Sequence, residues 1–350
     1  NRIPGVSSGG GGGGGFGGGG GGRGLGAGGG DQILIDGKRM AGKGNQSRDQ
    51  LGRISASQVD YIELIRGTSA ELDVRSSGQI VNVVLLEALD TDTISYQVNA
   101  DRYIDGEVVP GGSIAYSGQS GALTYLFSGQ AEPRYEHYTS KETSRLGDWS
   151  FNDQVREERT RDRTDYNLST NLGYEINERS SARLNGLYGI SDNTTDVNRW
   201  TTDLRSNPTT LAVQREDVPE DQNNWEIGGD YEYNFANGQR FKVIVVTNEN
   251  DRSNVRERYD VYDNGTESKN LFLASASTTR ERIVRGSYSM NVAQGQDIEF
   301  GAERAQTILD SSLRYALRTT TGTPSADFGG LVPQKVSNSN STVEEIRVEP

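Results

Sequence analysis

Four short turn signals recur at a nearly constant interval along most of the chain. They are GQSG (118–121), NERS (177–180), ANGQ (236–239) and AQGQ (293–296), whose first residues lie 59, 59 and 57 positions apart. Gly, Asn and Ser favour tight turns because they tolerate the backbone conformations and local hydrogen bonds that such turns require. This spacing predicts a meander of long paired strands, with tight turns at one end and longer connections at the other.

The segments that flank these turns alternate between apolar and polar residues. In WEIGGDYEYNF (225–235), the odd positions carry Trp, Ile, Gly, Tyr, Tyr and Phe, whereas Glu226, Asp230 and Glu232 stand among the even positions. Successive side chains of a β-strand point to opposite faces. Each strand is therefore predicted to have one apolar, aromatic face and one polar face.

Two arrangements bury such alternating strands. In a soluble sandwich the apolar faces meet each other, but its strands are typically short and its turns recur about every 8 to 12 residues. In an outer-membrane barrel the apolar face meets lipid, the polar face lines a lumen, and aromatic residues gather at the membrane interfaces. The long interval favours the barrel and predicts a set of interface aromatics near the tight turns: Tyr174, Tyr231, Tyr233, Phe235, Phe241, Tyr288 and Phe300.

Charged stretches mark the outer ends of the predicted strands. QVREERTRDRTDY and ENDRSNVRERYDVYD retain extended character but are too charged for lipid, so the strands are expected to continue beyond the membrane. Longer polar segments, namely 143–154, 205–222, 262–268 and 319–341, are predicted as the outer connections.

Composition narrows the function further. Only 32% of the 350 residues are hydrophobic and the formal net charge is −13, which disfavours nucleic acid as a partner. The chain has no cysteine and one histidine, and it shows no Ser/His/Asp set, metal-ligand cluster or catalytic loop signature. We therefore expect neither an enzyme nor a metal or cofactor site.

The first 90 residues differ from the rest of the chain in composition and in hydrophobic pattern. A glycine-rich tract at 9–30, which contains Phe16 and Arg23, is expected to be a loop, and Phe16 is a candidate to reach a solute. The strands DQILIDG, YIELI and QIVNVVLL, with a short helical turn at SASQ (55–58), predict a small α/β domain. We expect domain boundaries at 1–90 and 91–350.

The motifs of this small domain resemble the plug of TonB-dependent outer-membrane receptors. The matching elements are a strand that ends in an Asp-Gly turn, an "IE-hydrophobic-IRG" stretch, and a closing "G-x-hydrophobic-N-hydrophobic" strand; RIPGV (2–6) and RGLG (23–26) resemble the family's "PGV" and "RG" elements. The residues carrying the motif or its plug–barrel contacts would be Arg23, Asp36, Gly37, Glu63, Arg66, Gly67, Gly78 and Asn82.

The resemblance implies a mostly β protein, with an N-terminal α/β plug inside a large antiparallel transmembrane barrel of 22 strands. About ten of these strands fit into 91–350, whereas eleven hairpins of about 59 residues each need about 650 residues, so the chain is expected to be the first part of a longer receptor. A leader peptide and a TonB-recognition stretch are expected before Asn1. The implied location is the outer membrane of a Gram-negative bacterium.

The implied function is energised import of a scarce, bulky solute. The partners would be TonB with its ExbB/ExbD complex, outer-membrane lipid and lipopolysaccharide. The solute stays open between a siderophore, cobalamin, an oligosaccharide and a peptide. Two alternatives also stay open: a passive outer-membrane porin or adhesin barrel, and a secreted β-rich carbohydrate-binding protein.

Overall fold

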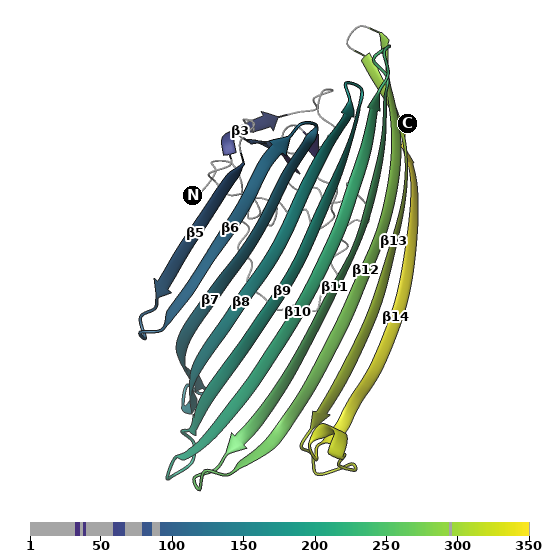
Figure 1. The fold of residues 1–350 in the computed structure, drawn as a ribbon. Helices are drawn as coiled ribbons and strands as arrows, with labels where there is room; N and C mark the ends of the chain where they lie inside the picture. Colours follow the sequence, from purple (N-terminus) through teal and green to yellow (C-terminus); the bar gives the residue numbers. More distant parts are fainter. Residues whose placement is uncertain are drawn as a thin grey trace.

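The computed structural model describes residues 32–35, 38–39, 59–66, 79–85, 92–293 and 296–349. Within these ranges the chain is almost entirely β-structure, which confirms the predicted fold class. Ten strands form one antiparallel sheet in strict sequence order, and Figure 1 shows them as a continuous curved wall. They are β5 (Thr93–Arg102), β6 (Val108–Ser120), β7 (Leu123–Arg145), β8 (Phe151–Asn177), β9 (Ser180–Asp203), β10 (Thr210–Asn234), β11 (Arg240–Val261), β12 (Glu267–Ala293), β13 (Gln296–Leu317) and β14 (Val332–Glu349).

The predicted tight turns all lie between paired strands. They join β6 to β7, β8 to β9, β10 to β11 and β12 to β13. In the β10–β11 turn, Gly238 adopts a φ of 81°, a left-handed conformation that glycine tolerates without steric cost. The register of these hairpins therefore follows from local sequence.

The outer connections are shorter than the sequence predicted. Most of 143–154 and 205–222 belongs to strands, so only 146–150 and 204–209 connect them. The prediction failed because these segments are polar enough to resemble loops, whereas most of their residues pair with neighbouring strands. Pro219 lies inside β10, and the pairing of β10 with β11 is interrupted at 218 and 219 where proline cannot donate a hydrogen bond.

The strands are far longer than a membrane requires. At about 3.3 Å per residue, the 27 residues of β8 span about 90 Å, whereas 9 to 11 tilted residues cross a bilayer. The extended conformation expected for the charged stretches is confirmed for QVREERTRDRTDY, which lies within β8, and for most of ENDRSNVRERYDVYD, which lies in β11 up to Val261. Their place outside the membrane stays a prediction.

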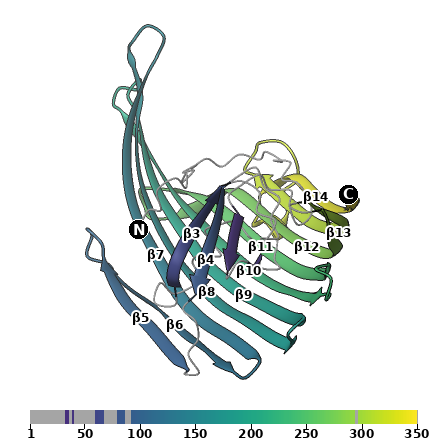
Figure 2. The ribbon, with the colours of Figure 1, turned by 90° about the horizontal axis from the view of Figure 1, so that it is seen from above.

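A second, four-stranded sheet is formed near the N-terminus by β1 (Gln32–Ile35), β2 (Lys38–Arg39), β3 (Val59–Arg66) and β4 (Gln79–Leu85), in the order β2-β1-β4-β3. The three predicted strands correspond to β1, β3 and β4. Leu34, Val81 and Val83 are fully buried and form its core. Viewed from above, β3 and β4 lie on the concave side of the long sheet (Figure 2). The expected helical turn at SASQ lies outside the described residues.

Among the residues that the structure describes, no helix is long and apolar enough to cross a membrane.

The long sheet differs from a β-sandwich. In the described chain its ten strands form a single sheet and not two stacked sheets.

Candidate functional site

The two faces of the long sheet show an inverted burial pattern, in which polar side chains are buried and apolar side chains are exposed. On β10, the carboxylates of Glu226 and Asp230 are buried (8% exposed each), whereas Ile227 between them is 51% exposed. Residues directly opposite each other in an antiparallel pair share a face. The register therefore extends this division across all ten strands.

Curvature explains why the polar face is the crowded one. Side chains converge on the concave face of a curved sheet and spread apart on the convex face, and the sheet is strongly curved in Figure 2. The polar residues thus occupy the concave face and the apolar residues the convex face. The exposed apolar residues of the convex face include Tyr96, Phe127, Leu168, Leu184, Tyr188, Ile227, Val245, Val284 and Ile346.

The seven predicted interface aromatics lie together near the tight turns. Tyr233, Phe241, Tyr288 and Phe300 are direct neighbours in one row across β10 to β13. Tyr231 precedes Tyr233 by two residues on β10. Tyr174 of β8 and Tyr231 lie at the same height in the sheet, because each is the register partner of Ala182 on β9. The Phe235 ring lies 4.8 Å from that of Tyr233 and 6.1 Å from that of Tyr288, in edge-to-face contacts. Their membrane role remains a prediction.

A second aromatic level follows the same face and was not singled out from the sequence. Tyr188 of β9 lies directly opposite Trp225 of β10, and Leu168 of β8 continues the row. Trp225 precedes Tyr233 by eight residues, which is about 27 Å along the strand and about 20 Å of height at the tilt of barrel strands. This separation is close to the apolar band of about 25 Å in outer-membrane barrels.

The apolar band shifts along the strands as it crosses the sheet. On β9 the band extends further from the tight turns than on β11. Ile190 of β9 is apolar although it pairs with Asn223, whereas on β11 the residue that pairs with Trp225 is the charged Glu249. On β12 the band ends at Val284, and the next residues on that face are Arg282 and Arg280. Such a diagonal band is expected when the strands are tilted relative to a flat bilayer.

The concave face is built from polar pairs between neighbouring strands. Arg183 and Asp230 face each other and form an ion pair of 2.9 Å, with only 3% of the Asp230 side chain exposed. Glu281 accepts hydrogen bonds from Asn248 (3.4 Å) and Thr307 (3.2 Å) on the two adjacent strands. Ser128 and Ser169 are joined at 2.6 Å. A water-facing lumen would be lined in this way.

One apolar island interrupts this polar surface. Val246, Ile283 and Ala305 are directly opposite one another on β11, β12 and β13, each nearly fully buried, and Ile244 packs against them. The island stabilises the wall without exposing apolar surface to the concave space.

Beyond the apolar band, the concave face carries arginines interleaved with carboxylates. Glu157 of β8 binds Arg199 of β9 (2.5 Å) and Arg159 of its own strand (3.0 Å). Arg256 of β11 pairs with the buried Glu216 of β10. Burial alone would raise the pKa of Glu157, but the two arginines outweigh it and hold this pKa below its usual value. Composition alone did not indicate these arginines, because the chain as a whole is acidic.

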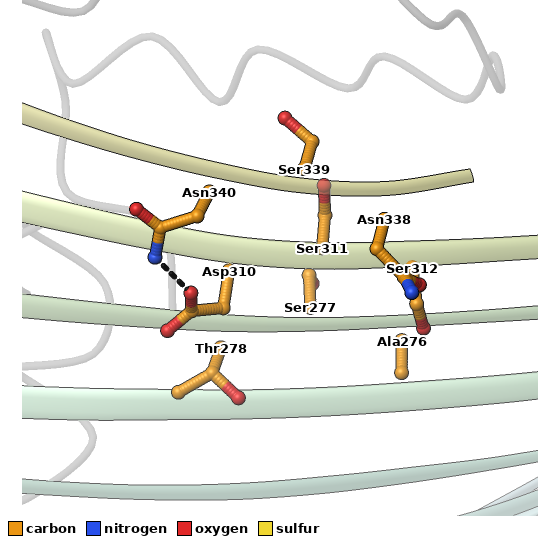
Figure 3. Close-up of a pocket in the computed structure, with 9 residues that line it drawn as sticks. All are labelled: Ala276, Ser277, Thr278, Asp310, Ser311, Ser312, Asn338, Ser339 and Asn340. Carbon is orange, nitrogen blue, oxygen red and sulfur yellow. Dashed lines mark hydrogen bonds between the residues drawn. The ribbon is translucent and has the colours of Figure 1, made fainter.

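A shallow hollow crosses β12, β13 and β14. Figure 3 shows it lined by small polar side chains, with Asn340 donating a hydrogen bond to Asp310. Asp310 also pairs with Arg280 at 3.0 Å. In the described part of the chain, no group of three or more His, Cys, Asp or Glu side chains is arranged to hold a metal ion.

Two predicted motif residues of the small domain come together. Glu63 of β3 and Asn82 of β4 are register partners, and the Asn82 amide donates to the Glu63 carboxylate at 2.9 Å. Asn82 is 5% exposed. Arg66 is the last residue of β3, opposite Gln79. Phe16, Arg23, Asp36, Gly37, Gly67 and Gly78 lie outside the described residues.

The comparison with protein families agrees with these motifs. Residues 1–78 match the family described as TonB-dependent Receptor Plug Domain. No curated protein matches the chain.

Solved structures with a similar fold are receptors of low identity. The ferric yersiniabactin uptake receptor FyuA from Yersinia pestis is 8% identical with a TM-score of 0.38, over 91% of this chain and 52% of FyuA. The ferric citrate transporter FecA is 11% identical (TM-score 0.34, 90% and 50%), and BauA, the ferric preacinetobactin receptor from Acinetobacter baumannii, is 10% identical (0.28, 91% and 61%). The chain thus spans about half the length of the first two, and similarities at this level carry no further conclusion.

The fold defines a class of protein in which a small N-terminal sheet lies on the concave, polar side of a long antiparallel meander. The N-terminal segment is a TonB-dependent receptor plug domain, so the family recognised from the sequence is confirmed.

Proposed function

We propose that this chain is the N-terminal part of a TonB-dependent outer-membrane receptor that imports a bulky solute. The observation that carries the proposal is the inverted burial of the long sheet: carboxylates are buried on its concave face while aliphatic and aromatic side chains are exposed on its convex face. Such a distribution is unfavourable in water but stable when lipid surrounds the convex face and water fills the concave space.

The mechanism follows from a plug domain combined with a polar-walled passage. The plug occupies a wide lumen, and solute binds above it on the long strand extensions. Tension applied by TonB, with ExbB/ExbD as the energising complex, rearranges the plug and opens a path. Polar contacts between plug and wall would suit this motion, because ion pairs and hydrogen bonds exchange with water without disrupting an apolar core.

The proposed domain division is a plug at 1–90 and the first part of the barrel wall at 91–350. The convex aromatics near the turns would lie at the periplasmic interface, and lipid and lipopolysaccharide would surround the band. The solute classes that fit are the four named from the sequence, and growth of a deletion strain on single candidate nutrients distinguishes them.

Conductance across a planar bilayer tests the proposal. The complete receptor is expected to conduct little, and deletion of residues 1–90 is expected to raise its conductance strongly because the lumen is then open. An unchanged conductance would support a passive porin or adhesin barrel instead. A complete protein that stays monodisperse in buffer without detergent would support the secreted carbohydrate-binding alternative. Uptake in cells lacking TonB should be lost.

A further inference from the structure

Five arginines gather on the concave face of the extension beyond the apolar band. We call them the arginine cluster: Arg159, Arg161, Arg199, Arg256 and Arg258, from β8, β9 and β11. Register places them on one face, since Arg159 lies opposite Val197, Val197 lies opposite Glu216, and Glu216 lies opposite Arg258. Three strand spacings separate β8 from β11, so the cluster is about 14 Å wide.

Two members of the cluster lack a carboxylate partner among the described residues. The Arg161 Nε donates to the amide oxygen of Asn193 at 3.0 Å, and the Arg258 Nε donates to that of Asn270 at 2.8 Å. These amides orient the guanidinium groups but do not neutralise them. The remaining nitrogens of both groups are available to an anion.

The local charge is opposite to that of the chain. Glu157 and Glu216 are the carboxylates that pair with the cluster. Two further acids lie at its margins: Glu136, opposite Arg161, and Asp260, which pairs with Arg318. Including these neighbours, six arginines face four carboxylates, in a protein whose formal net charge is −13.

Mutual repulsion within the arginine cluster indicates that its positive charge is not fully neutralised. The pKa of Arg256 lies below its usual value, first because of burial and then because Arg258, Arg199 and Arg159 are close to it. Holding like charges together costs free energy unless something compensates for them. Half of the Arg159 side chain and nearly half of that of Arg256 remain exposed to the concave space (51% and 45%).

We propose that the arginine cluster binds a multiply charged anion, namely a solute bearing two or more carboxylate, sulfate or phosphate groups within about 14 Å. The inference rests on the proposed function, of which it specifies the substrate class. Guanidinium groups bind such oxyanions in bidentate geometry, and several of them on neighbouring strands recognise several anionic groups at once. A neutral oligosaccharide would leave the unpaired arginines uncompensated.

A pair of probes that differ mainly in charge tests the proposal: sucrose octasulfate and sucrose. Binding to the complete receptor in detergent is measured by calorimetry at low and at higher salt. Sucrose octasulfate should bind, more weakly as salt increases, and sucrose should not. The double variant Arg161→Gln/Arg258→Gln should weaken binding about a hundredfold, since each lost charged hydrogen bond accounts for about tenfold.

Two controls separate charge from folding. Arg304→Gln removes an arginine on the convex face, paired with Glu344 and 63% exposed, and should leave binding unchanged. Arg161→Lys/Arg258→Lys keeps the charge and should retain much of the binding. Equal binding of sucrose, no binding of sucrose octasulfate at about 1 mM, or less than a threefold effect of the glutamine variant would each overturn the proposal.

These outcomes are distinct from those that test transport. TonB-dependent uptake of a neutral solute, without binding of sucrose octasulfate, would refute the anion site and leave the importer intact. Binding of sucrose octasulfate by a protein whose uptake is independent of TonB would retain the site and refute the importer.

Discussion

Asn82 of β4 donates a hydrogen bond of 2.9 Å to the carboxylate of Glu63, its direct partner on β3. Both residues belong to the motifs that identified the plug from the sequence. Asn82 is almost fully buried, so a polar group at this position requires a partner. The pair therefore stabilises the packing of two plug strands that are 19 residues apart in sequence.

The first prediction concerns this pair. Asn82→Asp places a second carboxylate against Glu63 and should destabilise the plug by about 2 kcal/mol, because like charges directly opposite in a sheet repel and the donor is lost. The swap Glu63→Gln/Asn82→Asp restores an amide–carboxylate pair and should recover most of this loss. Conductance leak through the complete receptor reports the change. Equal leak in the single and swapped variants would contradict it.

The second prediction concerns Arg183 and Asp230 on the concave face. Arg183→Met leaves the buried Asp230 carboxylate without its cation and should cost about 3 kcal/mol of unfolding free energy in detergent. The double variant Arg183→Met/Asp230→Leu should be less destabilised than this single variant, because no charge is left unpaired. Denaturant titration checks the order, and Arg134→Met, whose pair with Glu132 is half exposed, should have little effect.

The third prediction is that the convex face contacts lipid. Trp225 lies in the apolar band, whereas Trp149, in the β7–β8 connection, is 77% exposed. In vesicles, lipids with brominated acyl chains should quench a variant of the complete receptor in which Trp149, Trp200 and every other tryptophan except Trp225 are changed to Phe. Water-soluble acrylamide should instead quench a variant that retains only Trp149. The reverse pattern would show that lipid does not contact the convex face.

The fourth prediction concerns pH. The pKa of Glu157 is lower in the folded protein than in the unfolded chain, so its contribution to stability is complete above the unfolded value of about 4.3 and is lost as pH falls through the folded value. Glu157→Gln should therefore speed hydrogen exchange around β8 and β9 at pH 7, with a smaller difference from the native protein in acid.

A neighbour on the same strand is the matched control for this pH dependence. Glu158 faces the opposite side and pairs with the exposed Arg156, so Glu158→Gln should change exchange little at either pH. A difference for Glu157→Gln that did not shrink on acidification would contradict the prediction.

Much of the fold was predictable from particular residues. Each of the four turn signals lies between two paired strands, and the alternation in 225–235 predicted which side chains share a face. The seven aromatics did gather near the turns, since a period of two and a fixed turn position determine their register. Glu63 and Asn82 were predicted as motif residues, but nothing in the sequence indicated that they form a pair.

The lengths of the outer connections and the arginine cluster were not predictable. The segment 205–222 is polar enough to resemble a loop, yet Glu216 and Asp217 lie in a strand where arginines of the neighbouring strand and of β10 itself bind them. Glu157 and Arg199 are 42 residues apart and meet only through the β8–β9 register. Such compensation becomes visible only once the strands are paired.

The sequence by itself determined the strand-and-turn meander, the two chemical faces and the plug, because these depend on a local period of two and on short motifs. The tertiary structure alone decided how far the strands extend and that distant arginines converge on the concave face. The physical reason is that curvature and cross-strand pairing are collective properties of ten strands, and no single segment specifies either.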